Sequence, residues 1–122
     1  MANILVIEDD EMIRQLLLRR LSRAGYEVQS AVDGATGIAI ALGKTADLIL
    51  LDLRLPDMTG YEVAQRIRRG GGNGTPIIAV SASCTDADRQ HAITCGCNAF
   101  HPKPMDWGKL LEQIDTYLKA AG

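Results

Sequence analysis

The sequence predicts an α/β fold in which a parallel sheet lies between two layers of helices. Two apolar runs, at residues 4–7 and 48–51, are continuous rather than alternating, which is typical of strands buried on both faces. Segments of helical periodicity separate these runs from three further short strand-like segments. This regular alternation of strand and helix implies right-handed crossovers and a sheet covered on both faces.

Two strands and two helices are expected in the first third of the chain. Gly25 and Gly43 each follow a segment of helical periodicity, where a glycine commonly ends a helix. Asp33 precedes the second of these segments and is expected to cap it. The strands span 4–7 and 26–31, the first helix has its apolar positions at Ile13, Leu17, Leu21 and Ala24, and the second at Ala35, Ile38, Ala39 and Leu42.

The rest of the chain alternates in the same way. The buried strand at 48–51 ends in Asp52, and Pro56 and Gly60 predict a loop after it. Pro102 restricts the last strand to an edge of the sheet, because proline has no N–H to donate. The remaining elements are a helix around Val63, Ala64 and Ile67, a strand over 76–81, a helix over about 85–95, a strand over 99–101, and a final helix that Asp106 caps and that carries Leu110, Leu111, Ile114 and Leu118.

Size, charge and composition exclude several classes of protein. The chain has 122 residues, enough for one domain with one core, which we expect to span 1–122. Its net charge of −2 argues against direct nucleic-acid binding. No apolar run approaches the roughly 20 residues of a membrane span, and the amino end lacks the basic segment of a secretory signal. Three cysteines do not make a disulfide framework, so we expect a cytoplasmic protein without membrane insertion.

Three acidic residues are expected to meet at the carboxyl end of the sheet. Asp52 ends a buried strand, and Glu8 and Asp9 follow the first strand. In the common strand order 2-1-3-4-5 the first and third strands are neighbours, about 4.8 Å apart, so Asp9 and Asp52 converge with Glu8 close by. Carboxylates this close repel one another and need a cation, and oxygen ligands partly open to water suit Mg²⁺. The spacing by itself assigns only Asp9 and Asp52 as ligands.

Four short motifs each follow or end an expected strand. They are Glu8-Asp9, the segment LDLRLPDMTG at 51–60, Ser81-Ala82 and Lys103-Pro104. In this order and at this chain length they resemble the motifs of response-regulator receiver domains, of the single-domain chemotaxis type, over essentially the whole chain. The resemblance implies a flavodoxin-like, doubly wound (βα)5 fold with a five-stranded parallel sheet in the order 2-1-3-4-5.

The resemblance implies that Asp52 is a phosphoacceptor. In such a domain the aspartate takes a phosphoryl group from a histidine kinase or a histidine phosphotransfer protein, with Mg²⁺. Such a protein catalyses its own phosphorylation and slow dephosphorylation but is not a conventional enzyme. A cis peptide bond between Lys103 and Pro104 is implied as well. The implied site comprises Asp9 and Asp52 as direct Mg²⁺ ligands, Glu8 as a ligand through water, the backbone carbonyl of Arg54 as a further ligand, and Lys103 and Ser81 as partners of the phosphoryl oxygens.

The resemblance also implies how a signal leaves the domain. Ser81 and Phe100 are the implied switch, in which the hydroxyl turns toward the phosphoryl group and the aromatic ring turns inward. Phe100 stands where many such domains have tyrosine, so its ring brings no hydroxyl. The expected output surface, formed by the fourth helix, the fifth strand and the last helix, contacts a downstream protein. The alternative is that this receiver is a fragment of a larger regulator or of a hybrid kinase.

Several polar or sulfur-containing side chains are expected to be structural. Asp10 is expected to cap the first helix, and Asp57 to belong to the turn beside Pro56. His91 is expected to be exposed and to have no catalytic partner. The segment 95–97 contains two cysteines, which are expected to be small buried side chains rather than metal ligands.

Other phosphate-related functions fit the sequence less well. The segment Gly43-Lys44-Thr45 closes a helix, whereas a P-loop opens one, and the glycine-rich stretch 70–74 is expected to be a flexible connection away from the site. A phosphatase with an aspartate nucleophile needs a second acid where Arg54 stands. A flavin-binding module on this fold needs a hydroxyl-rich loop where the sequence EDDEM occupies 8–12.

Overall fold

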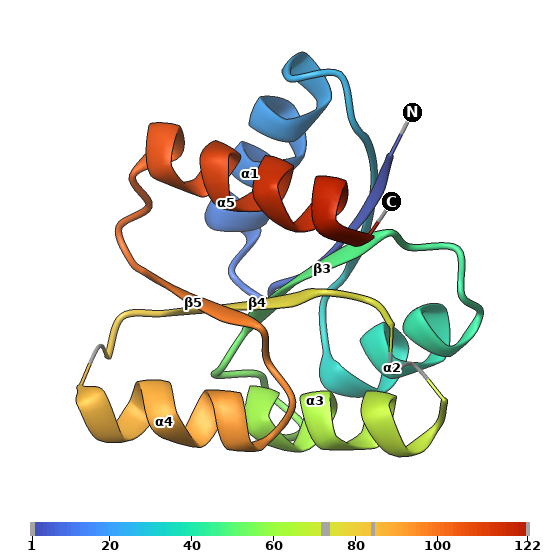
Figure 1. Ribbon diagram of the computed structural model, residues 1–122, viewed down its shortest axis with the longest axis vertical. Helices are drawn as coiled ribbons and strands as arrows, with labels where there is room; N and C mark the ends of the chain where they lie inside the picture. Colours follow the sequence, from blue (N-terminus) through green and yellow to red (C-terminus); the bar gives the residue numbers. More distant parts are fainter. Residues whose placement is uncertain (1, 72–73, 84, 122) are drawn as a thin grey trace.

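Strands and helices alternate along the whole computed structural model (Figure 1). The structure describes residues 2–71, 74–83 and 85–121, and within these ranges it has five strands and five helices. In chain order they are β1 (Asn3–Ile7), α1 (Glu11–Arg23), β2 (Glu27–Ala31), α2 (Gly34–Leu42), β3 (Leu48–Asp52), α3 (Gly60–Arg69), β4 (Ile77–Ser81), α4 (Asp86–Thr94), β5 (Ala99–Pro102) and α5 (Trp107–Ala121).

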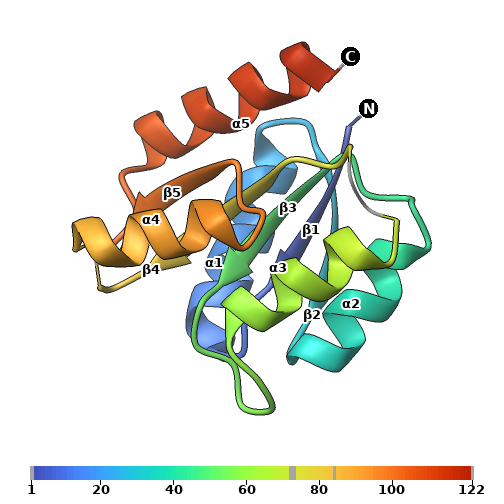
Figure 2. The ribbon, with the colours of Figure 1, turned by 60° about the horizontal axis from the view of Figure 1, so that its bottom comes forward.

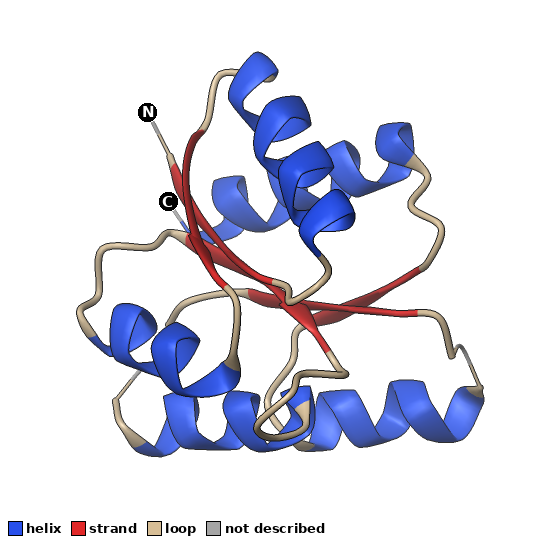
Figure 3. Cartoon of the chain, turned by 180° about the vertical axis from the view of Figure 1, so that it is seen from behind, coloured by secondary structure: helices blue, strands red, loops and turns tan. Residues whose placement is uncertain are grey.

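The strands form one parallel sheet in the order β2-β1-β3-β4-β5. This confirms the predicted α/β class and strand order. Helices α1 and α5 cover one face of the sheet, and α2, α3 and α4 cover the other (Figures 1 and 3). Figure 2 shows β1 and β3 inside the sheet, with β2 and β5 at opposite edges.

The core has two halves, one on each face of the sheet. Successive side chains of β1 alternate between them: Leu5 and Ile7 belong to the half beneath α2, α3 and α4, and Ile4 and Val6 to the half beneath α1 and α5. Every residue of β3 and β4 is buried. Burial on both faces explains why these strands are continuously apolar rather than alternating.

The strand register brings the carboxyl ends of the strands together at one end of the sheet. Ile7 pairs with Leu51, so the residues that follow β1 lie beside Asp52 at the end of β3. Ser81, at the end of β4, pairs with Pro102 at the end of β5. The segments that follow these four strands therefore leave the sheet on the same side, where open α/β sheets place their ligand sites.

The helices begin and end largely as predicted. Asp10, Asp33 and Asp106 each accept a hydrogen bond from a backbone N–H three residues ahead, at the starts of α1, α2 and α5. Gly25 follows α1 with φ +97°, a backbone conformation that favours glycine. Among the described residues, no helix is both long enough and apolar enough to cross a bilayer.

Four strand boundaries differ by one residue from the prediction, and the first of them is the start of β1, at Asn3 rather than Ile4. β2 begins one residue late because the N–H of Tyr26 donates to the carbonyl of Leu21, at the end of α1, rather than to the sheet. β4 also begins late, because Pro76 has no N–H to donate. β5 runs one residue further, to Pro102, and occupies an edge as predicted.

The described residues of the glycine-rich stretch, Gly70, Gly71 and Gly74, lie between the end of α3 and the amino end of β4, and Gly70 ends α3. They lie at the opposite end of the sheet from Asp52, away from the site as predicted. Gly72 and Asn73 lie outside the described residues.

Candidate functional site

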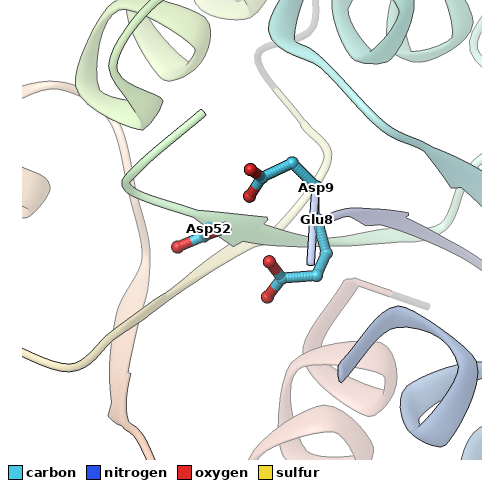
Figure 4. A group of neighbouring side chains, drawn as sticks. All are labelled: Glu8, Asp9 and Asp52. Carbon is cyan, nitrogen blue, oxygen red and sulfur yellow. The ribbon is translucent and has the colours of Figure 1, made fainter. Parts of the chain in front are cut away.

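Three carboxylates converge at the carboxyl ends of β1 and β3 (Figure 4). One oxygen from each of Glu8, Asp9 and Asp52 lies within 4.8 Å of the other two, and the described part of the chain holds no other such group of His, Cys, Asp or Glu side chains. Glu8 and Asp52 are 2% and 6% exposed, whereas Asp9 is exposed to solvent. The structure therefore brings together the three acids that the sequence places at the carboxyl end of the sheet.

Backbone hydrogen bonds position the acidic turn after β1. The N–H of Glu8 donates to the carbonyl of Ala31 at 3.0 Å, which continues the pairing of β1 with β2. The N–H of Asp10 donates to Oε2 of Glu8 at 3.2 Å, and the side chain of Asp10 caps α1. Asp9 lies between these two residues, and its carboxylate lines the cleft above β3.

An ammonium from the far end of the chain joins two of the three acids. The Nζ of Lys103 lies 2.9 Å from Oε1 of Glu8 and 3.4 Å from Oδ1 of Asp52. The N–H of Lys103 donates to the carbonyl of Ser81 at 2.8 Å, which anchors it beside β4. The peptide bond between Lys103 and Pro104 is cis, as the resemblance implies.

Burial and ionic contacts act in opposite directions on the pKa of Glu8 and on that of Lys103. Burial raises the pKa of Glu8 to about 7 and nearby Asp52 adds to the effect, although the Lys103 ammonium acts in the opposite direction. Burial acts to lower the pKa of Lys103, but its hydrogen bond to Glu8 and the charge of Asp52 outweigh burial and raise that pKa. Lys103 therefore stays cationic at neutral pH, while Glu8 exchanges its proton near neutrality.

The other predicted site residues line the same cleft. Ser81 ends β4 and is 6% exposed, and its Oγ accepts a hydrogen bond from the N–H of Ser83 at 3.1 Å. The N–H of Arg54 donates to Oδ1 of Asp52 at 3.2 Å, so the loop after β3 turns back over the carboxylate. The cleft has a volume of about 280 Å³ and is lined by Glu8, Asp9, Asp10, Ile13, Asp52, Arg54, Ser81, Ala82 and Lys103.

Asp57 has a structural role beyond the turn that the sequence predicts. Its two carboxylate oxygens accept hydrogen bonds from the N–H groups of Gly34 and Ala35, at 2.8 and 2.9 Å. These bonds hold the pKa of Asp57 below its ordinary value. Asp57 thereby ties the loop after Asp52 to the start of α2. No local pattern could have indicated this contact, because it depends on the loop after β3 passing the start of α2.

The histidine and cysteines assigned a structural role lie away from the acids. His91 is exposed on α4, and its ring stacks on that of Tyr61 with 3.9 Å between ring centroids, a contact that the sequence did not indicate. Cys95 and Cys97 are buried, and burial raises the pKa of both thiols, that of Cys97 to about 12. Such thiols stay protonated and unreactive at neutral pH. Cys84 lies outside the described residues.

A larger hollow, of about 800 Å³, lies over β5 and α5. Phe100, the implied switch residue, lines it, and the guanidinium of Arg89 lies 5.5 Å from the centre of the Phe100 ring. None of the three clustered acids borders this hollow. The smaller acidic cleft is therefore the candidate site for chemistry, because it combines buried carboxylates with a cation and the larger hollow does not.

Comparisons with known proteins agree with the arrangement of this cleft. A family model described as the response regulator receiver domain matches residues 4–115. The DNA-binding dual master transcriptional regulator RpaA of Synechocystis sp. is 37% identical over 120 residues, which are 98% of this chain and 50% of RpaA. The response regulator ArlR of Staphylococcus saprophyticus is 34% identical over 119 residues, 98% of this chain and 53% of ArlR. The chain thus spans about half the length of these relatives.

Solved structures share the fold over almost the whole chain. The CheY-like response regulator receiver domain protein from Methanospirillum hungatei JF-1 has a TM-score of 0.92 and 28% identity, covering 99% of this chain and 96% of its own. The receiver domain of the sensor histidine kinase PA1611 from Pseudomonas aeruginosa PAO1 has a TM-score of 0.90 and 29% identity, covering 97% and 98%. The latter is described with a magnesium ion coordinated in its active site cleft.

Proposed function

We propose that this chain, which belongs to the response-regulator receiver domain family of two-component systems, accepts a phosphoryl group on Asp52 and signals through a change of conformation. The placement of Asp52 carries the proposal. Its carboxylate is 6% exposed, ends a central strand, and has one oxygen 3.4 Å from the Lys103 ammonium. A carboxylate in such a place can act as a nucleophile, with a cation at hand for the charge that it receives.

The proposed reaction is a displacement at phosphorus. An oxygen of Asp52 forms a bond to the phosphorus of a phosphohistidine while the P–N bond breaks, and the electron pair of that bond returns to the imidazole nitrogen. Lys103 and Ser81 line the same cleft and are proposed to bind phosphoryl oxygens through the ammonium and the hydroxyl. The chain would thus catalyse its own phosphorylation and, with water as the attacking group, its slow dephosphorylation.

The chemistry of the acidic cluster fits a Mg²⁺ ion. Three carboxylates offer oxygen ligands within reach of one another, one of them open to water, which suits a cation that keeps part of its hydration shell. We propose Asp9 and Asp52 as direct ligands, Glu8 as a ligand through water, and the backbone carbonyl of Arg54 as a further ligand. When bound, Mg²⁺ would neutralise charge on these acids and on a phosphoryl oxygen.

The proposed output runs through α4, β5 and α5 to a downstream protein. The Ser81 hydroxyl turns toward the phosphoryl group, and the ring of Phe100 moves into the space behind β4. Within the nine residues of α4 only Ala92 is buried, so this helix makes few buried contacts with the rest of the fold. Few buried contacts make an element easier to shift between two positions.

The donor and the setting of the domain complete the proposal. The donor is a histidine kinase or a histidine phosphotransfer protein in the cytoplasm, and residues 1–122 form a single receiver domain. RpaA is described as DNA-binding, but this chain matches only half of it, and we propose no direct contact of the matched half with nucleic acid. A receiver within a larger regulator or a hybrid kinase would use the same site.

Intact mass spectrometry after incubation with acetyl phosphate tests the proposed function. With Mg²⁺ the wild-type chain should gain one phosphoryl group, and Asp52→Asn should gain none, because an amide is not a nucleophile and is a poorer metal ligand. Asp47→Asn is the matched control. Asp47 lies just before the amino end of β3, at the end of the sheet opposite Asp52, where its side chain accepts a hydrogen bond from the N–H of Asn3. Phosphorylation of Asp52→Asn at the wild-type yield would refute the assignment.

A further inference from the structure

A buried histidine lies in the strand that leads to Lys103. His101 is 3% exposed, occupies β5, and contacts Gln113 of α5 through its ring. The chain has two histidines, and the other, His91, is exposed on α4. The reaction proposed above gives His101 no role. A buried imidazole needs hydrogen-bond partners for both ring nitrogens, so the partners of His101 define its protonation state.

Hydrogen bonds at both ring nitrogens select one tautomer of His101. Nδ1 lies 2.7 Å from Oε1 of Gln113, while Nε2 of Gln113 donates to the carbonyl of Phe100 at 3.3 Å. Because that carbonyl can only accept, the Gln113 oxygen faces the ring, and Nδ1 carries the proton. The ring Nε2 accepts from the backbone N–H of Asp106 at 3.2 Å, and that N–H can only donate. The neutral Nδ1–H ring satisfies every one of these contacts, and a protonated ring does not.

Hydrogen bonds anchor both ends of the loop that carries Lys103. At the start of the loop, the N–H of Lys103 donates to the carbonyl of Ser81 at 2.8 Å. At its end, the N–H of Asp106 donates to His101, and the carbonyl of Asp106 accepts from the N–H of Leu110 at 2.8 Å in the first turn of α5. The backbone of Lys103 is therefore tied to β4 on one side. On the other side its loop is tied to His101, which bonds both to the end of the loop and to α5.

We propose that the neutral ring of His101 positions Lys103, and that protonation of this ring slows phosphoryl transfer to Asp52. This inference rests on the proposed function of Asp52. A protonated ring has no lone pair at Nε2, so it meets the N–H of Asp106 as a second donor, and the loop must move away. Lys103 then loses its place beside Asp52, and small displacements of a group at the reacting centre lower rates steeply.

Charges of both signs surround His101. Two cationic and two anionic side chains line the hollow beside the ring, so they offset one another. On β4 the residue paired with His101 is Val80, which carries no charge. The four side chains are Arg89 from α4, Asp106 from the loop, and Lys109 and Glu112 from α5.

NMR spectroscopy of the metal-free protein tests whether His101 holds the loop. On acidification the amide signals of 102–106 should shift together with the signals of the His101 ring, as that ring gains a proton at Nε2. Repeating the series in Glu8→Gln removes the contribution of that carboxyl group. Titration of His91 is the internal control and should leave these amides unchanged. An Nε2–H ring, a ring that never protonates, or loop signals that ignore the ring would overturn the proposal.

Rates of phosphorylation by acetyl phosphate at saturating Mg²⁺ test whether the loop matters for the reaction. His101→Gln keeps an acceptor for the N–H of Asp106 but does not titrate. It should match the wild type at the pH values where NMR shows the wild-type ring neutral. Where NMR shows that ring protonated, it should be about threefold to tenfold faster, the rate equivalent of one hydrogen bond. His91→Gln should match the wild type throughout. Since all three proteins contain Glu8, its ionisation cancels in the ratios of their rates.

The outcomes separate this proposal from the one on which it rests. A ratio of His101→Gln to wild type that does not change with pH overturns the positioning role, whatever the absolute rates. If the wild type takes up no phosphoryl group at any pH, the proposed function of Asp52 fails instead. The NMR series then decides by itself whether His101 holds the loop.

Discussion

Glu8 shows how one buried residue makes the site sensitive to pH. Its carboxylate is 2% exposed and shares the Lys103 ammonium with Asp52. Burial raises the pKa of Glu8 from its ordinary value of 4.5 to about 7, so the folded metal-free protein favours the protonated form. The stability that this group contributes is therefore complete below pH 4.5 and is lost as the pH rises through about 7.

We expect the metal-free wild type to lose stability relative to Glu8→Gln between about pH 5 and pH 8, because the amide does not ionise. Denaturant unfolding of both proteins in EDTA at several pH values measures the difference. Saturating Mg²⁺ should remove much of it, since the ion favours the carboxylate form of Glu8. Parallel stability curves for the two proteins in EDTA would show that the pKa of Glu8 is not raised.

Among the elements, α2 is held by the loop that follows β3. Asp33 caps α2 from its own end, and Asp57 accepts from the next two N–H groups, those of Gly34 and Ala35. A Cβ on Gly34 would lie only 2.6 Å from Cγ of Met58, so the loop and the helix are in close contact. The loop that carries Arg54 over Asp52 is therefore fixed to a second element.

Asp57→Ala should destabilise the protein at neutral pH, because two N–H groups at the start of α2 lose their acceptor. The pKa of Asp57 is lowered in the folded state, so its contribution is present above the ordinary value of 3.8 and is lost as the pH falls through the lower folded value. Thermal unfolding at several pH values should thus show a difference that shrinks in acid. Glu112→Ala, an exposed carboxylate on α5, is the control. An equally large difference at every pH would contradict a role for the Asp57 charge.

NMR spectroscopy tests the switch proposed for α4 and β5. Beryllofluoride, which mimics an acyl phosphate, should shift the backbone NMR signals of the described residues among 85–105 in the wild type. Ser81→Ala should still accept phosphate, though more slowly, and should respond weakly over this range, because it has no hydroxyl to turn toward the phosphoryl group. Equal shifts in both proteins would show that Ser81 does not couple Asp52 to Phe100.

Across the whole molecule, prediction from sequence succeeds where the signal is local. Continuous apolar runs mark the buried strands. An aspartate directly before a helical pattern marks a helix start, and in the structure it accepts a hydrogen bond from the N–H three residues further on. Convergence of the acids could also be predicted, because a parallel sheet brings the carboxyl ends of neighbouring strands together once their order is given.

Contacts that reach across elements could not be predicted in this way. Arg68 of α3 donates to the carbonyls of Thr75 and Gly96 at 2.7 to 3.0 Å and so joins α3 to the segments before β4 and β5. The contact of Asp57 with α2 and that of His101 with α5 have the same character. Each depends on a side chain meeting a backbone or side-chain group that only tertiary packing brings near, and no periodicity records such a meeting.

The most direct test of the central claim locates the phosphoryl group within the chain. Protein treated with acetyl phosphate and Mg²⁺ is reduced with borodeuteride, which converts an aspartyl phosphate to labelled homoserine, and is then digested with trypsin. The peptide 45–54 lies between Lys44 and Leu55 and contains Asp47 and Asp52. We predict the label in this peptide, with fragment masses that assign it to position 52. A label at Asp47, at Asp9 or at Asp57, or a phosphorylated chain that takes up no label, would contradict the assignment of Asp52 as the phosphoacceptor.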